Sequence, residues 1–192
     1  APSLVRASEA GLGDWTIEAI VQLLQTGVSG SASVIGPMAE VVLHSTQHLT
    51  EPDLRAIAVY LQSLPQEKEP PLPERNAAAA TGSAMGADIY DKQCAGCHGD
   101  NGQGVAGAYP ALAGNRAVTM ANTANLVQVV LHGGFAPATQ GHPRPFGMPP
   151  YKLELDDRSV AAVLTHIRSA WGNRAGPVRE LDVSRYRGTA PQ

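Results

Sequence analysis

The chain has 192 residues, enough for one or two small domains, and 43% of them are hydrophobic, which suffices for a packed core. Aromatic residues make up only 5%, so a bound apolar cofactor could supply part of the interior. The net charge of -3 gives no sign of the basic stripe typical of nucleic-acid binding, and no apolar run approaches the roughly 20 residues that cross a bilayer. No signal peptide opens the chain, so Ala1 is expected to be a mature or trimmed N-terminus.

The first segment, roughly residues 1–65, is predicted to be helical. The expected helices run from the cap Asp14 to about Thr26, over about 38–45, and from the cap Thr50 to Leu64. Gly27 and Pro65 follow the first and third of these and are suited to end them. Apolar residues three and four positions apart give each long helix one buried face.

Residues 66–80 differ in composition from their surroundings and are predicted to be a linker. Prolines 70, 71 and 73 forbid a helix interior and favour an extended, semi-rigid spacer. The second segment is expected at 81–176, and a tail at 177–192 follows it. The chain is thus predicted to hold two helical segments of unequal size.

The second segment is predicted to repeat and extend the first. Its helices are expected near 83–93, 123–132 and 156–170, with glycine- and proline-rich loops over 99–114 and 133–150. Both segments show a helix, a loop with glycine, proline and methionine, and a closing helix. The first segment therefore resembles the rear half of the second, and the predicted fold class is all-α.

The run Cys94-Ala95-Gly96-Cys97-His98 is the attachment motif for a c-type haem. Two thiols one helical turn apart match the two vinyl groups on one edge of the porphyrin, and His98 then projects toward the iron as its proximal ligand. A disulfide between Cys94 and Cys97 would close too small a loop to add much stability. The two cysteines are therefore interpreted as chemical rather than structural, and one covalent haem c is predicted.

Two other uses of Cys-x-x-Cys compete with this interpretation. A thioredoxin-like redox site requires a strand before the motif and a parallel sheet, and no convincing strand pattern is present. A zinc site requires four ligands, and only the scattered His132, His142 and His166 could complete one. The helical surroundings favour haem.

The second axial ligand is predicted to be Met148. It lies between Gly147 and two prolines, where a restricted backbone presents the thioether on a rigid loop. His142 is the competing ligand, and simple core filling is the alternative role for a methionine.

Residues 82–172 resemble a class I cytochrome c domain. The resemblance rests on the helix before the motif, on Pro110-x-Leu112-x-Gly114, on the Met148-Pro149 loop and on the closing helix. It implies that the Pro110 carbonyl accepts a hydrogen bond from the imidazole of His98 and fixes the orientation of that ring. The alternative is that Pro110 is an ordinary loop proline. Leu112 and Tyr90 are expected in the haem site. Tyr90 and Trp171 are expected either to join the first and last helices or to pack on the haem.

The resemblance is closer to the last domain of multi-haem cytochrome subunits of periplasmic alcohol, gluconate and aldehyde dehydrogenases. It is carried by 131–134, 137–139, Met148-Pro149 and 171–173. It implies electron transfer rather than enzymatic catalysis, with a dehydrogenase catalytic subunit as donor. The implied acceptor is a quinone, a terminal oxidase or another cytochrome. The implied location is the periplasm, and association with the inner membrane through partners is compatible with it.

The chain departs from that group by having one haem motif where three are typical. It is expected to be a fragment, or else its first domain lacks the front half. Met38 would ligate a preceding haem in an intact subunit, or simply pack. His44 and His48 could chelate a metal on a helix, but a solvated helix end is preferred. Single charges that could contact propionates or a partner, or remain solvated, are Arg116, Arg144, Lys152 and Arg158.

Two other functions remain open at this stage. A haem peroxidase would need an open or displaceable sixth position, and a haem-based sensor would bind a small ligand there. A methionine that fills this position instead favours outer-sphere electron transfer.

Overall fold

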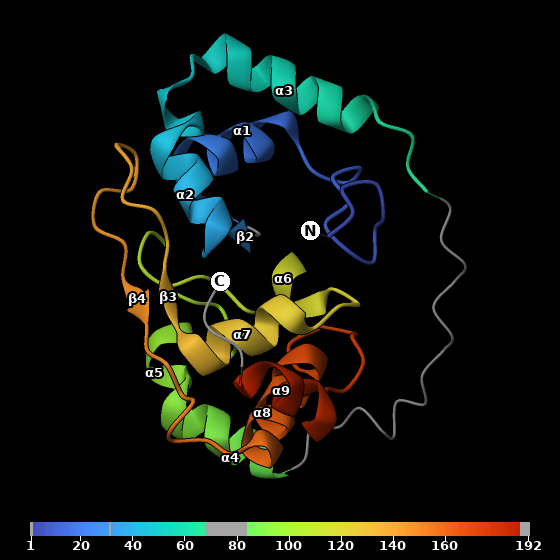
Figure 1. The fold of residues 1–192 in the computed structure, drawn as a ribbon, viewed down its shortest axis with the longest axis vertical. Coiled ribbons are helices and arrows are strands. Elements are labelled where there is room, and N and C mark those ends of the chain that lie inside the picture. Colours follow the sequence, from blue (N-terminus) through green and yellow to red (C-terminus); the bar gives the residue numbers. More distant parts are fainter. Residues whose placement is uncertain (1, 31, 68–83, 189–192) are drawn as a thin grey trace.

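The computed structural model describes residues 2–30, 32–67 and 84–188, which are mainly helical (Figure 1). The N-terminal unit, residues 2–67, contains α1 (Ile17–Thr26), the strand pair β1 (Val28–Ser29) and β2 (Ala32–Ser33), α2 (Pro37–His44), the 3-10 helix η1 (Thr46–His48) and α3 (Glu51–Ser63). The C-terminal unit, residues 84–188, contains α4 (Ala84–Gln93), α5 (Ala95–His98), α6 (Arg116–Thr119), α7 (Ala124–His132), β3 (Gly134–Phe135), β4 (Gly147–Met148), α8 (Asp157–Ser169) and α9 (Glu180–Arg187). The predicted helical class is confirmed, and the strands are two short antiparallel pairs. The linker expected at 66–80 lies almost wholly outside the described residues.

The helix caps follow the sequence with one exception. Thr50 caps α3 and Asp156 caps α8, each accepting a hydrogen bond from a backbone N–H of the first turn. The cap of α1 is Thr16, whose hydroxyl accepts from the N–H of Ala19, so the prediction for Asp14 was wrong. Asp14 lies outside the helix, where its carboxylate pairs with Arg116 of the C-terminal unit.

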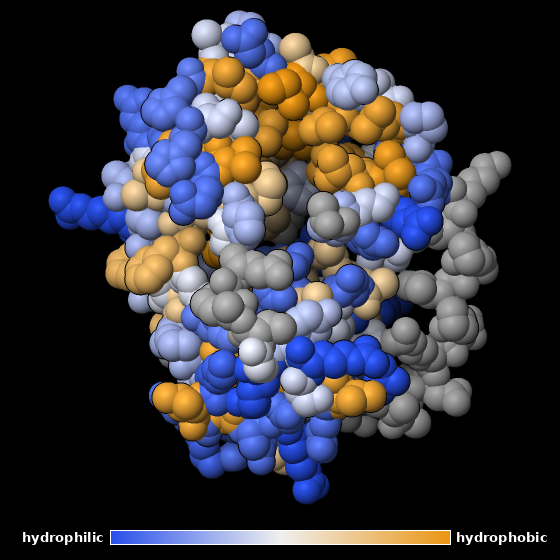
Figure 2. Space-filling model, viewed as in Figure 1, coloured by the Kyte–Doolittle hydropathy of each residue, from blue (hydrophilic) through white to orange (hydrophobic). Residues whose placement is uncertain are grey.

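The N-terminal unit has a small core between α1 and α3. The buried members are Leu12, Ile20, Val21, Leu54 and Ala58. Much apolar surface of this unit stays exposed, and Figure 2 shows apolar side chains gathered over its helices in the upper half of the view. The exposed residues are Leu4, Met38, Val41, Leu49, Ile57, Val59 and Tyr60.

The C-terminal unit is built on the crossing of α4 with α8. At the crossing, a Cβ on Gly86 would lie 2.3 Å from the carbonyl oxygen of Ala162, so only glycine allows this approach. One turn further, the ring of Tyr90 lies 4.7 Å from that of Trp171 and 5.7 Å from that of His166, measured between centroids. Tyr90 and Trp171 thus join the first and last helices of the expected domain, which is one of the two roles predicted for them.

The two units share an order of elements that matches the repeat seen in the sequence. In each, a helix ends at a glycine with positive φ, Gly27 at 80° and Gly133 at 68°. A two-stranded pair and a methionine follow, and then a capped helix of 13 residues. The N-terminal unit therefore has the elements of the rear half of the C-terminal unit.

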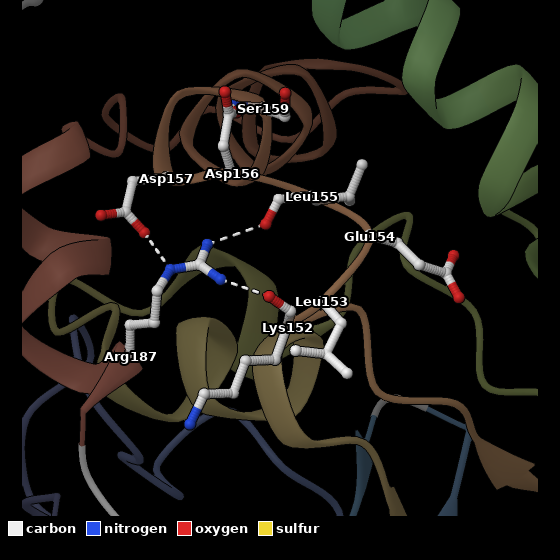
Figure 3. A pocket seen from close by; sticks show the side chains of 8 residues that line it. All are labelled: Lys152, Leu153, Glu154, Leu155, Asp156, Asp157, Ser159 and Arg187. Atoms are coloured by element: carbon white, nitrogen blue, oxygen red, sulfur yellow. Dashed lines mark hydrogen bonds and ion pairs between the residues drawn. The ribbon is translucent and has the colours of Figure 1, made fainter.

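The segment expected as a tail contains α9, which packs against α7 and α8. Val183 is fully buried there. The guanidinium of Arg187 pairs with Asp157 at 2.5 Å and donates to the carbonyl oxygens of Lys152 at 2.5 Å and Leu155 at 2.8 Å (Figure 3). Arg187 thereby fixes the chain that connects β4 to α8.

Among the described residues, no helix combines the length and the apolar character needed to cross a membrane.

Candidate functional site

The haem motif occupies a single helical turn directly after α4. The N–H of Cys94 donates to the backbone carbonyl oxygen of Tyr90 at 2.9 Å, and this bond continues the pattern of α4. The N–H groups of Cys97 and His98 both donate to the carbonyl oxygen of Cys94. Cys94 is half-buried and Cys97 exposed, and both thiols are free. Two thiols and one imidazole are therefore presented from one turn of backbone.

The imidazole of His98 is oriented by the loop that follows the motif. Its Nδ1 lies 2.9 Å from the carbonyl oxygen of Pro110. Because a carbonyl can only accept, Nδ1 carries the proton and Nε2 is left with a lone pair for a metal. Burial lowers the pKa of His98, opposed by the bond to Pro110, so the imidazole is neutral at pH 7, as a ligand must be.

The loop over 99–114 is held in place from both sides. The carbonyl oxygen of Gly102 accepts from the N–H groups of Leu112 at 2.7 Å and of Ala113 at 3.0 Å. The N–H of Gly104 donates to the backbone carbonyl oxygen of His98. The side chain of Asn173 accepts from the N–H of Gly114 and donates to Leu112. The carbonyl of Pro110 is thus fixed relative to α8.

Tyr90 and Leu112 were both predicted in the cofactor site, and the structure places Tyr90 beside the motif and Leu112 on the core against which Cys94 packs. Tyr90 is 1% exposed and its hydroxyl donates to the carbonyl oxygen of Gly99 at 2.6 Å. Burial raises the pKa of Tyr90 to about 12, so the hydroxyl remains a donor. Leu112 is half-buried and packs on the core of the C-terminal unit together with Cys94.

Met148 lies on β4 and packs against the same core as Cys94 and Leu112. Its residue pairs with Gly134 of β3. A Cβ on Gly133 would lie 2.3 Å from the carbonyl oxygen of Met148, so this strand pair is brought directly against the end of α7. The ring of His142, the competing ligand, has Nε2 at 3.3 Å from the carbonyl oxygen of Gly107.

The acidity of Cys94 differs from that of a thiol redox site. Burial, with a smaller contribution from Cys97, raises the pKa of Cys94 to about 11. In redox-active Cys-x-x-Cys sites the attacking thiol has a lowered pKa instead. The local environment therefore does not favour thioredoxin-like chemistry.

Taken as a donor set, the site suits a covalently held porphyrin. One turn offers two thiols and a neutral imidazole whose Nε2 is free, and a half-buried thioether packs on the same core. Large apolar side chains are left exposed on the loop after the motif and on the segment from β3 to β4, as expected for surface that an apolar cofactor would cover. They are Val105, Phe135 and Phe146.

A surface hollow with a volume of about 530 Å³ lies elsewhere, at the start of α8 (Figure 3). It is open and lined by charged side chains and backbone beside Arg187. The hollow does not include the motif or Met148.

Three positioning residues were not predicted from the sequence. The hydroxyl of Tyr151 donates to the carbonyl oxygen of Gln93 at 2.7 Å, which ties the chain after Met148 to the end of α4. Arg168 is buried in α8 and donates to backbone carbonyls near α6. Asn173 holds the Pro110 loop. The Trp171-Gly172-Asn173 run after a helix was the only available signal for the last of these.

The remaining sequence candidates lie away from the motif. Met38 is 48% exposed at the start of α2. His44 ends α2 and pairs with Glu40 at 3.0 Å, whereas His48 belongs to η1, so they do not share a helix. Within the described residues, no group of three or more His, Cys, Asp or Glu is placed to hold a metal ion.

Arg116 is not a solvated single charge, because it binds both carboxylate oxygens of Asp14 at 2.6 Å.

Comparison with known proteins agrees with this geometry. The Cytochrome c family description matches residues 83–171. The chain is 40% identical to the cytochrome c subunit of alcohol dehydrogenase (quinone) from Gluconacetobacter polyoxogenes, over 98% of the chain and 42% of that relative. It is 33% identical to the gluconate 2-dehydrogenase cytochrome c subunit of Pantoea cypripedii, over 92% of the chain and 42% of the relative. It is 42% identical to a cytochrome c-552 of Thermus thermophilus, over 47% of the chain and 70% of the relative. The chain thus spans about two fifths of the length of the dehydrogenase subunits.

Proposed function

The chain belongs to the cytochrome c family of electron carriers, and from that premise we propose that it transfers single electrons through one haem c ligated by His98 and Met148. When bound, the haem supplies a one-electron redox centre whose potential is raised by a thioether ligand. Cys94 and Cys97 would hold it by thioether bonds. His98 and Met148 would fill both axial positions, which leaves no open position for substrate chemistry.

The observation that carries this proposal is the placement of His98. Its Nδ1–H donates to Pro110 at 2.9 Å, which orients the ring and leaves Nε2 free one turn from both thiols. The half-buried thioether of Met148 on the same core supports the second ligand. The pKa of His98, lowered by burial, keeps the ring in its ligating form.

The partners are proposed from the relatives. Because relatives that align with nearly the whole chain are cytochrome c subunits of dehydrogenases, we propose a dehydrogenase catalytic subunit as electron donor. A quinone, a terminal oxidase or another cytochrome is the proposed acceptor. Covalent haem attachment in bacteria takes place outside the inner membrane, so we propose a periplasmic location.

The Met148→Ala variant tests the ligand set. We expect loss of the long-wavelength sulfur-to-iron charge-transfer band of the oxidised protein, carbon monoxide binding to the reduced protein, and a lower reduction potential. The matched control is Met85→Ala, because Met85 lies on the exposed side of α4 and is 37% exposed. A Met148→Ala spectrum identical to that of the unsubstituted protein would contradict the proposal. Carbon monoxide binding by the unsubstituted reduced protein would favour a sensor or a peroxidase.

A further inference from the structure

The loop between α7 and Tyr151, which carries Met148, contacts both units of the chain. Its ends belong to the C-terminal unit, because β3 pairs with β4 and the N–H groups of Tyr151 and Lys152 donate to carbonyls of α7 at 2.9 and 3.1 Å. Between β3 and β4 the loop leaves that unit and extends to the N-terminal unit, as the orange segment of Figure 1 shows. The middle of the loop is therefore supported by the N-terminal unit, whereas its ends are supported by the C-terminal unit.

Thr139 is the centre of that support. Its hydroxyl donates to the carbonyl oxygen of Thr26 at 3.1 Å, across 113 positions of sequence. Thr26 is the last residue of α1, where helix carbonyls lack a partner within the helix. Thr139 is 3% exposed and Thr26 is half-buried, so a replacement without the hydroxyl would take this donor from a partly buried carbonyl.

The surrounding contacts make the support rigid. Pro137 lies directly on the end of α1, where a Cβ on Gly27 would approach its Cγ to 2.3 Å. The N–H of Gln140 donates to the side chain of Gln47 at 3.3 Å. Backbone hydrogen bonds of 3.1 Å in both directions join Thr139 to His142, so the tip moves as one piece.

The same tip contacts the loop on the proximal side of the motif. His142 lies 3.3 Å from the carbonyl oxygen of Gly107, and the ring centroids of Phe146 and Tyr109 are 5.1 Å apart. Pro110, which orients His98, is the next residue after Tyr109. A displacement of the tip is therefore transmitted toward both axial ligands.

We propose that the N-terminal unit, which has no haem motif of its own, braces the Met148 loop, and that Thr139 is the positioning residue through which it acts. The inference rests on the proposed function, because it takes Met148 as an iron ligand. Met148 lies on β4 at one end of this loop, so a loop whose middle is unsupported can displace β4 and carry the thioether away from the iron. The bond to Thr26 shifts that equilibrium toward the ligated form.

The experiment compares Thr139→Val with two matched controls in the full haem-loaded chain. Valine keeps the shape of threonine and removes the hydroxyl, whereas Thr139→Ser retains it. Asp14→Asn weakens a contact between the units that lies outside the loop, the ion pair with Arg116, and leaves the hydrogen bond from the N–H of Ala121 to the carbonyl oxygen of Ser8 in place. Carbon monoxide affinity of the reduced protein and the charge-transfer band of the oxidised protein are measured for each.

In Thr139→Val we expect a carbon monoxide affinity about fivefold higher, the size that follows from losing the partly buried hydrogen bond to Thr26, together with a weaker band. The N–H of His142 also loses the Thr139 hydroxyl as an acceptor but keeps the carbonyl oxygen of Thr139. Thr139→Ser and Asp14→Asn should match the unsubstituted protein. Gln47→Ala, which removes the acceptor for Gln140 from the other side, should shift both readouts in the same direction even if Thr139→Val fails to mature.

Three results would overturn the brace. Unchanged readouts in Thr139→Val and Gln47→Ala, beside a lost band in Met148→Ala, would reject the brace and leave the proposed function standing. An equal shift in Asp14→Asn would show that any loosening between the units has the same effect. A Met148→Ala variant with an unaltered band would reject the proposed function itself, and the brace with it.

Discussion

Arg168 shows how one side chain can hold three segments together. It is 3% exposed, and its guanidinium donates to the carbonyl oxygens of Gly176 at 2.7 Å, Val118 at 2.6 Å and Met120 at 2.9 Å. We expect Arg168→Met to lower the free energy of unfolding by about 3 kcal/mol, because buried carbonyls lose charged donors. Urea unfolding followed by circular dichroism measures this. If Arg168→Met lowered the free energy of unfolding by less than Arg158→Met, a substitution of an exposed arginine, this expectation would be contradicted.

His166 gives the fold a sensitivity to acid. Burial lowers the pKa of His166, and the charge of Asp91 opposes that shift. The unfolded chain therefore takes up this proton near the ordinary value of 6.5, and the folded chain only at lower pH. The contribution of neutral His166 to the free energy of unfolding is fully present above about pH 6.5. It is lost as the pH falls from there through the lower pKa of the folded protein.

His166→Phe keeps a ring against Tyr90 and Trp171 but cannot titrate. Between pH 7.5 and pH 5, its urea midpoint should fall less than that of the unsubstituted protein. Equal falls in the two proteins would show that His166 does not contribute to acid sensitivity.

The sequence predicted the roles of some single residues and not those of others. Cys94, Cys97 and His98 were predicted because their chemistry depends on spacing along the chain. Arg168 was not, because its three acceptors come from segments up to 50 positions away. Asp14 was assigned to a helix cap on local grounds, and an arginine 102 positions away holds it instead.

At the level of elements, the junction of α7 with the Met148 strand depends on Gly133. Its φ is 68°, and a Cβ there would lie 2.3 Å from the carbonyl oxygen of Met148. Gly114 has the same φ but open space around its Cβ position. Gly133→Ala should therefore displace β4 and abolish the charge-transfer band, whereas Gly114→Ala should only add backbone strain of about 1 kcal/mol. The visible spectra of the two variants check this, and equal bands would contradict it.

Helices with strong local signals were predicted, and those without were not. Thr50 and Asp156 precede apolar residues at helical spacing, so α3 and α8 were placed to within about two residues. α9 has little apolar periodicity, and its position is set by Val183 in the core and by Arg187. The strand pairs are two residues long and form only because the loops fold back on themselves.

For the whole molecule, the sequence predicted two helical units and a linker but not their contact. The repeat and the proline-rich stretch are visible in the chain, since both are local. The docking of the Met148 loop on α1, through Thr139 and Thr26, depends on residues 113 positions apart and has no counterpart in composition or periodicity. The sequence thus indicated the donors of the candidate site and the support of His98 by Pro110, but not the supports that come from distant segments.

The pairing of α4 with α8 also sets an order of events during biosynthesis. Cys94 leaves the ribosome well before residues 157–169 of α8, which pack against α4 in the finished fold. Contacts between distant parts of a chain form slowly compared with a local helix. Cys94 packs on a core that includes residues of α8, so its thiol lacks part of the burial that raises its pKa until α8 docks. The motif is therefore more open to reactions of its thiols before the closing helix docks than in the finished fold.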